Sequence, residues 1–223
     1  MWRYPLLSLF ALTYVVWGAY NWYIGRPVHT LDGILVPGEP LQADVAASTA
    51  AFRYGRWALT PRASYRITAR ILGVERYHFD QLSGLIPEDL ALGWGPMSDN
   101  RILDRMEIHQ SDRFYFWRAS RELSLGRDVI ISHSANTHVI PGNATLGRQL
   151  SSLRPGQVVR LTSLLVNARR DDGAWIDTSM VRTDTGAGAC EVMLVQEVDT
   201  APDVYATAVD DAAASAAPPG ADP

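Results

Sequence analysis

The sequence contains no lysine, and all 20 of its basic residues are arginine. Schiff-base chemistry and the P-loop both need a lysine amine, so both are excluded. Cysteine is almost as scarce. Cys190 stands alone without a partner for an intramolecular disulfide, and no CxxC or paired Cys/His zinc pattern is present. From these absences we expect no metal site and no cofactor.

An excess of basic charge is also lacking, since the formal net charge is -4 and the pI is about 5.7. This balance excludes the strongly basic surface of a general nucleic-acid binder, so we expect no nucleic-acid partner. Apolar residues make up 47% and charged residues 20%, which is typical of a globular protein. A chain of 223 residues has room for one ordinary domain with appendages.

Charged residues are missing from residues 5–24, which read PLLSLFALTYVVWGAYNWYI. A helix of this length spans roughly 30 Å, the thickness of the hydrocarbon core of a bilayer. The sequence therefore predicts a transmembrane helix that contacts the lipid bilayer through 5–24, within an N-terminal anchor of residues 1–26. A cleaved signal peptide and a buried core helix are the alternatives, although bulky neighbours crowd the small pair Gly18-Ala19.

The flanking charges bear on orientation. Arg3 and the free amine favour an N-terminus inside the cell, while Arg26 opposes them. No second apolar span follows, so everything after the anchor lies on one side of the membrane. We predict a single-pass protein of the bacterial inner membrane with its C-terminal domain in the periplasm, and the scarcity of cysteine is consistent with that compartment.

Three further regions follow the anchor. Residues 27–63 are rich in turn-forming Pro and Gly and are expected to form a connector and the first strands. Residues 64–198 are expected to form a β-rich, barrel-like domain. Residues 199–223 are mostly Ala, Asp and Pro, which predicts a disordered tail.

The β-rich region begins with strict alternation over 64–77, which predicts a half-buried strand. The other expected elements are a loop with a helical turn (79–97), a hairpin (106–118), an apolar strand (129–131), a loop (132–143), a helix (144–153), a hairpin (158–182) and a final strand (191–198). Many strands with one short helix predict a mainly β fold, a small OB-like barrel. An α+β fold, an SH3-like fold and an open mixed sheet are the alternatives.

Four motifs occur in order behind the apolar segment: GILVPGEP, DLALGWGPMSD, SHSANTHVIP and RTDTGAGACE. In these motifs the chain resembles an uncharacterised family of bacterial single-pass membrane proteins. The resemblance covers most of residues 1–198 and excludes the tail. It implies a folded domain behind one span and carries no particular activity.

Residues 132–138, SHSANTH, are the first candidate site. His133 and His138, with Asn136 between them, could supply a general base or two metal ligands. Their spacing does not match the helical pair of HExxH, so the metal signal is weak. A turn whose Ser, Asn and Thr side chains satisfy their own backbone is the structural alternative.

Residues 184–187, DTGA, match the active-site tetrapeptide of aspartic proteases. In those enzymes two aspartates face each other across a dyad and share a proton. The chain has one DTG, and Arg182 and Thr183 stand where a buried apolar strand should precede it. We therefore favour a Gly-rich turn with Asp184 as a local cap.

Arginine alternates with aromatic residues in 52–57 and 113–118, where Arg113 and Trp117 are candidates for stacking on a sugar ring, a base or a protein. Ordinary strand packing with Arg stems over apolar surface is the structural alternative. Trp94 and Met97 flank a predicted tight turn and are candidates for binding a partner, unless they pack inward.

These patterns favour a non-enzymatic, membrane-anchored binding or assembly module of the envelope, with an envelope protein as its partner. The alternative is a periplasmic hydrolase. Its site would gather His133, Asn136 and His138 with a carboxylate from Asp177 or Asp184.

Overall fold

The structure is a computed structural model that describes residues 5–46, 49–186 and 188–202. Most of the predicted disordered tail, residues 203–223, lies outside these ranges. So do the first four residues of the predicted anchor and Ala187 of the DTGA tetrapeptide.

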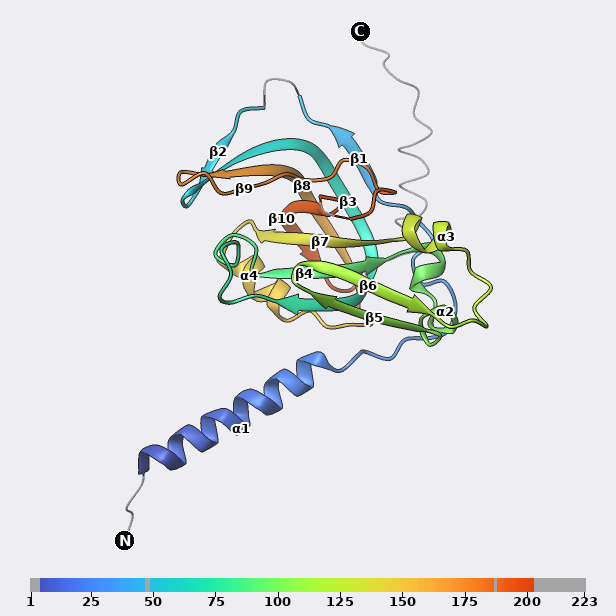
Figure 1. The fold of residues 1–223 in the computed structure, drawn as a ribbon, viewed down its shortest axis with the longest axis horizontal. Coiled ribbons are helices and arrows are strands. Elements are labelled where there is room, and N and C mark those ends of the chain that lie inside the picture. The colour runs from blue at the N-terminus through green and yellow to red at the C-terminus, as the bar shows by residue number, and fades with distance from the viewer. Residues whose placement is uncertain (1–4, 47–48, 187, 203–223) are drawn as a thin grey trace.

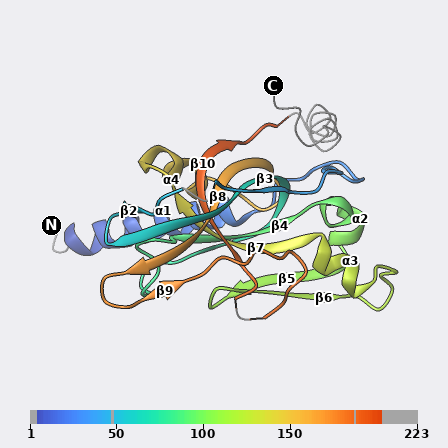
Figure 2. The same cartoon turned by 90° about the horizontal axis from the view of Figure 1, so that it is seen from above.

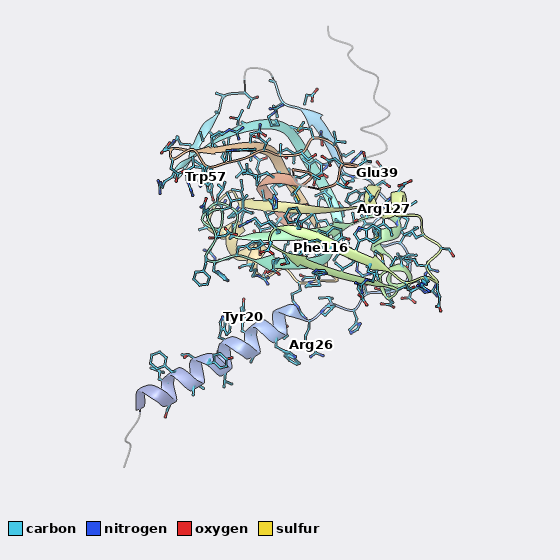
Figure 3. The ribbon with its side chains drawn as sticks, in the orientation of Figure 1. Tyr20, Arg26, Glu39, Trp57, Phe116 and Arg127 are labelled. Atoms are coloured by element: carbon cyan, nitrogen blue, oxygen red, sulfur yellow. The ribbon has the colours of Figure 1, made fainter. Side chains whose placement is uncertain are left out.

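The N-terminal apolar segment forms one helix, α1 (Pro5–Gly25), which projects away from the body of the protein (Figure 1). The large apolar side chains that the structure describes on this helix, from Leu9 to Tyr23, are exposed, Tyr20 among them (Figure 3). We expected this segment to cross a membrane. In the described part of the chain, no helix is long and apolar enough to do so.

An eight-stranded mixed sheet forms the body, and the prediction of a mainly β fold is confirmed. Its strands are β1 (Leu41–Asp44), β2 (Phe52–Tyr54), β3 (Trp57–Arg76), β4 (Glu88–Gly93), β7 (Ser134–Pro141), β8 (Val158–Arg170), β9 (Trp175–Ile176) and β10 (Glu191–Asp199). All pairings are antiparallel except β7 with β10, which run parallel.

The long strand β3 links the two ends of this sheet. One of its edges pairs with β8 over 57–70, and its other edge pairs with β4 over 70–76. The pairings β3–β4, β4–β7, β7–β10, β10–β8 and β8–β3 therefore run in a ring. The alternating face predicted for β3 is confirmed, because Tyr65, Ile67 and Ile71 are buried inside this ring with Leu161 and Met193.

A second, two-stranded sheet lies outside the ring as the hairpin of β5 (Met106–Ser111) and β6 (Phe114–Ala119). Viewed from above, it forms a separate layer over β4 and β7 (Figure 2). The short helices are η1 (Gly95–Ser98), α2 (Asn100–Leu103), α3 (Arg127–Ser132) and α4 (Ala144–Ser151). Helix α4 matches the predicted helix at 144–153, and Asn143 caps it by accepting two backbone hydrogen bonds.

Several local predictions were wrong. Residues 79–97 contain the buried strand β4, residues 129–131 belong to α3, and residues 132–143 contain β7. Of the strand expected over 174–182, only the short strand β9 (Trp175–Ile176) is formed. Both β4 and β7 are buried on two faces, and each carries polar residues at neighbouring positions (Glu88 and Asp89; Asn136, Thr137 and His138). Neither strand therefore shows the apolar–polar alternation of a half-buried strand.

The connector after α1 is held against the body by residues 154–156. The Val28 N–H donates to the Pro155 carbonyl (2.7 Å), and Arg154 donates to the Arg26 carbonyl and lies over the Tyr23 ring. Gly156 has a φ of 88°, a region that favours glycine, and its N–H donates to the Ile71 carbonyl. A side chain at Gly156 would collide with the Val28 backbone.

Gly156→Ala should therefore lower the free energy of unfolding by about 2 kcal/mol and loosen the connector. Urea denaturation and limited proteolysis of the connector measure the two effects. The matched control is Gly126→Ala, because Gly126 has free space around it and no positive φ. Equal behaviour of the two variants would contradict this account.

Candidate functional site

A cavity of about 360 Å³ opens between β6, β7 and the segment that leads into β10. Tyr115 and Trp117, on the inward face of β6, supply aromatic surface, and Asn136 and Cys190 supply polar groups. Figure 3 shows Phe116 on the face of the hairpin and Arg127 near one end of it. The cavity thus combines an apolar wall with a polar floor, as small-molecule and peptide sites do.

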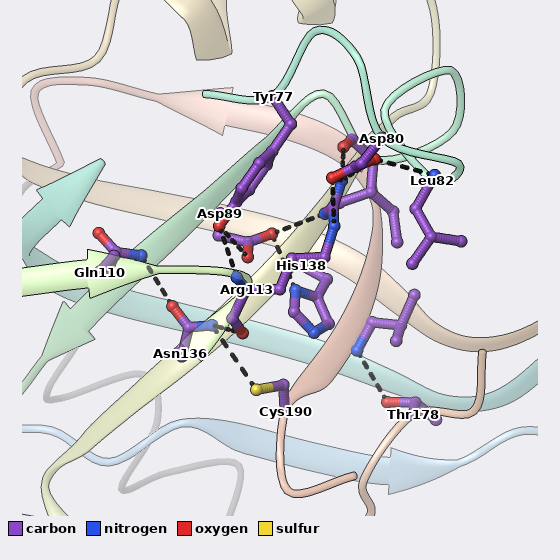
Figure 4. A network of polar contacts seen from close by, with 12 residues as sticks. Tyr77, Asp80, Leu82, Asp89, Gln110, Arg113, Asn136, His138, Thr178 and Cys190 are labelled. Atoms are coloured by element: carbon purple, nitrogen blue, oxygen red, sulfur yellow. Dashed lines mark hydrogen bonds and ion pairs between the residues drawn. The ribbon is translucent and has the colours of Figure 1, made fainter. Parts of the chain in front are cut away.

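Asp89 lies behind the polar floor, on the outer face of β4, and is fully buried. Its carboxylate accepts hydrogen bonds from the Tyr77 hydroxyl (3.1 Å) and from Arg113 (3.4 Å). It also contacts the Nδ1 atom of His138 at 2.8 Å (Figure 4). A buried carboxylate needs such donors to offset the loss of water, so Asp89 holds all three side chains in place.

His138 lies directly opposite Asp89 in the pairing of β7 with β4, and its side chain is 8% exposed. Burial lowers the pKa of His138. Hydrogen bonds and charge interactions with Asp89 and Cys190 outweigh this effect and raise the pKa to about 9. Because Asp89 occupies Nδ1, Nε2 is the ring nitrogen left free to interact with the nearby Cys190.

Cys190 is a free, half-buried thiol at the start of β10. The Asn136 amide group donates to its sulfur (3.6 Å) and to the Arg113 carbonyl (3.1 Å). Gln110 fixes the other end of Asn136 by donating to its Oδ1 atom at 2.7 Å. Gly73 leaves room for Gln110, because a Cβ there would lie 2.6 Å from the Gln110 Oε1 atom.

Glu191 lines the cavity beside Cys190 and is 3% exposed. Its Oε2 atom is buried and has no hydrogen-bond partner. Burial raises the pKa of this carboxyl group to about 7, and the nearby Asp184 adds to the rise. A buried oxygen without a donor is costly, and the raised pKa lowers that cost because the carboxyl group can keep its proton.

Arg113 ties the hairpin to this network. Its guanidinium forms a bidentate pair with Asp80, donates to the Ile86 carbonyl and stacks 4.0 Å from the Tyr77 ring centre. Asp112 and Arg113 form the hairpin turn with φ values of 52° and 67°. Residues other than glycine are uncommon in this region, so these contacts hold the turn against its backbone preference.

The structure brings together five of the residues singled out from the sequence. His138, Asn136 and Arg113 belong to the network around Asp89, and Trp117 and Asp184 line the cavity. Asp184 accepts a hydrogen bond from the Ser179 hydroxyl (2.7 Å), as expected of a local cap.

The other singled-out residues lie elsewhere. His133 ends α3, where its Nδ1 atom contacts the Val129 carbonyl and its ring packs near Trp94. Asp177 pairs with Arg169 at 2.6 Å on the surface. Trp94 and Met97 are fully buried and offer no surface to a partner. The hydrolase site that would gather both histidines with Asp177 is therefore not assembled.

Asp89 and Cys190 were not identified as site residues from the sequence. Each one belongs to a motif quoted above, in DLALGWGPMSD or in RTDTGAGACE. Only the pairing of β4, β7 and β10 places them side by side. The signal available in the sequence was the presence of charged residues within apolar segments, at Asp89 and Glu191.

The arginines that alternate with aromatic residues are largely neutralised. Arg53 pairs with Asp171 and Arg118 pairs with Glu107. Among the residues that the structure describes, no group of three or more His, Cys, Asp and Glu side chains is placed to hold a metal ion. Comparisons with family models, with curated proteins and with solved structures find no match to this chain.

Arg113→Ala should lower the free energy of unfolding by about 3 kcal/mol, because the fully buried Asp89 loses one of its two cationic partners and keeps only His138. Arg118→Ala removes an exposed ion pair from the same hairpin and should change that free energy by less than about 1 kcal/mol. Urea denaturation of the full-length protein compares the two. Similar losses in both variants would show that the Asp89 network contributes little.

The raised pKa of His138 predicts how stability depends on pH. The folded protein holds this proton more tightly than the unfolded chain, in which the pKa is near 6.5. His138 therefore contributes roughly 2–3 kcal/mol to the free energy of unfolding. This contribution is complete below pH 6.5 and is lost as the pH rises through about 9.

In urea denaturation series between pH 6.5 and 9, the free energy of unfolding of the wild type should therefore fall as the pH rises. That of His138→Gln should not fall. His78→Gln is the control, because His78 is exposed, and it should follow the wild type. A wild type whose stability is constant across this range would contradict the assignment.

Proposed function

We propose that this protein is a membrane-tethered binding module of the bacterial envelope. In this proposal α1 inserts into the inner membrane, the body lies in the periplasm, and the cavity under β6 binds a segment of an envelope protein. The observation that carries the proposal is the cavity of about 360 Å³ between the hairpin and β7, because it combines the aromatic side chain of Trp117 with the polar groups of Asn136 and Cys190.

The tether is supported by the surface of α1. Its described large side chains are apolar and more than half exposed on every side, from Leu9 (58%) to Tyr23 (57%). A helix that is apolar all round needs an apolar environment, which lipid provides. Arg154 and the backbone around Val28 hold the end of this helix to the body, so the cavity would stay near the membrane.

We interpret the ring of strands as an OB-like barrel. The closed succession of pairings through β3, β4, β7, β10 and β8 supports this, as does the position of α4 between β7 and β8. The hairpin β5–β6 is an addition between β4 and β7 that covers one side of the ring and forms the aromatic wall of the cavity.

Trp117→Ala removes part of this wall and should abolish the association with the partner. The measurement is native mass spectrometry of the tagged full-length protein, extracted gently from its own membrane. Trp175→Ala is the matched control, because Trp175 is 64% exposed on β9, away from the cavity. We expect a stoichiometric partner on the wild type and on the control, and a lone Trp117→Ala chain.

Two outcomes would contradict the proposal. A wild-type chain that is always alone would remove the binding function. A partner retained equally by Trp117→Ala would place the interface outside the cavity.

A further inference from the structure

We propose that Cys190, His138 and Asp89 form a nucleophilic thiol site that cleaves an acyl compound, an ester or an amide, bound in the cavity. Cys190 is the nucleophile, His138 transfers protons, and Asp89 is a positioning residue. The inference uses the cavity of the proposed function, but it does not depend on the identity of the partner.

The geometry has the order that thiol nucleophiles require. A reactive thiol needs a base within hydrogen-bonding reach, and the base needs a third group to orient it. Here Asp89 holds His138 by Nδ1 at 2.8 Å. The Cys190 sulfur lies on the same side of β7 as the imidazole, 3.6 Å from the amide nitrogen of Asn136, which precedes His138 by two residues. Figure 4 shows the His138 ring between Asp89 and Cys190, with Asn136 on the other side of the sulfur.

The surroundings hold this arrangement rigidly. Asp89 is also fixed by Tyr77 and Arg113, and Asn136 is fixed by Gln110. Three separate elements, β4, β7 and the hairpin β5–β6, therefore support the sulfur and the imidazole. Preorganisation of this kind lowers the cost of reaching a reactive geometry.

The cavity beside the thiol has room for such a compound. Its volume is about 360 Å³, and Cys190, Asn136 and Trp117 are among the residues that line it. The substrate carbonyl would lie at the sulfur, and Tyr115 and Trp117, on the inward face of β6, would contact its apolar part.

The reaction balances with water as the only co-reactant. As the Cys190 sulfur attacks the carbonyl carbon, His138 takes the thiol proton and a C–S bond forms. The bond to the alcohol or amine breaks as His138 gives that leaving group the proton. His138 then takes a proton from water, which attacks the thioester. The C–S bond breaks, the acid leaves, and His138 returns the proton to the sulfur.

The lone cysteine makes the test specific. Full-length protein is mixed with p-nitrophenyl acetate at neutral pH, release of p-nitrophenol is followed, and the acetylated residue is located by mass spectrometry. We expect a burst of one acetyl group per chain on Cys190, followed by steady turnover. Cys190→Ser should lose the burst, and His138→Gln should slow acetylation about 100-fold.

His133→Gln is the matched control, because His133 lies outside the network, and it should react like the wild type. For Asp89, the readout is the pH profile of acetylation, which Asp89→Asn should shift because the imidazole loses its charged partner. The rate at which iodoacetamide alkylates Cys190 is a second measure of the reactivity of the thiol. Circular dichroism identifies variants that fail to fold.

The proposal is overturned if wild-type Cys190 is acetylated no faster than N-acetylcysteine, or if folded His138→Gln reacts at the wild-type rate. It is also overturned if the acetyl group is never released. Partner capture by Cys190→Ser separates the two proposals. If this variant keeps the partner and the wild-type thiol is unreactive, only the binding function stands. If the wild-type thiol is reactive and no partner is captured, only the thiol chemistry stands.

Discussion

The buried carboxylate of Asp89 is the interaction on which the arrangement of the site depends. A carboxylate removed from water must be met by several donors, and here they come from three different places: Tyr77 after β3, His138 on β7 and Arg113 at the tip of β5–β6. The hairpin cannot move away without leaving that charge uncompensated. The same constraint orients His138 towards Cys190 and keeps the aromatic wall over the cavity.

The ring of strands brings the parts of the site together. Strand β7 presents Ala135 and Val139 to the interior and Asn136 and His138 to the hairpin. Its parallel pairing with β10 places Glu191 opposite Thr137, so the thiol that precedes β10 arrives beside the imidazole. The interior supplies the rigidity, and the opposite face of β7 carries Asn136 and His138.

Part of the site could be predicted from the sequence. The motif around residues 132–138 identified His138 and Asn136, and the alternation of arginine with aromatic residues identified Arg113 and Trp117. The same reasoning placed His133 beside His138, although it packs near Trp94. Residues 132–143 were interpreted as a loop because the outward face of β7 is polar. That polarity is balanced by Asp89, which lies 49 positions away in the chain.

The sequence by itself determined the elements whose pattern is local: the apolar helix α1, the alternating strand β3, the hairpin β5–β6 and the capped helix α4. It also excluded lysine and disulfide chemistry. Only the tertiary structure decided which side chains meet. The contacts of Asp89, His138 and Cys190 depend on the register of non-neighbouring strands, and a shift of one residue would turn each side chain to the opposite face.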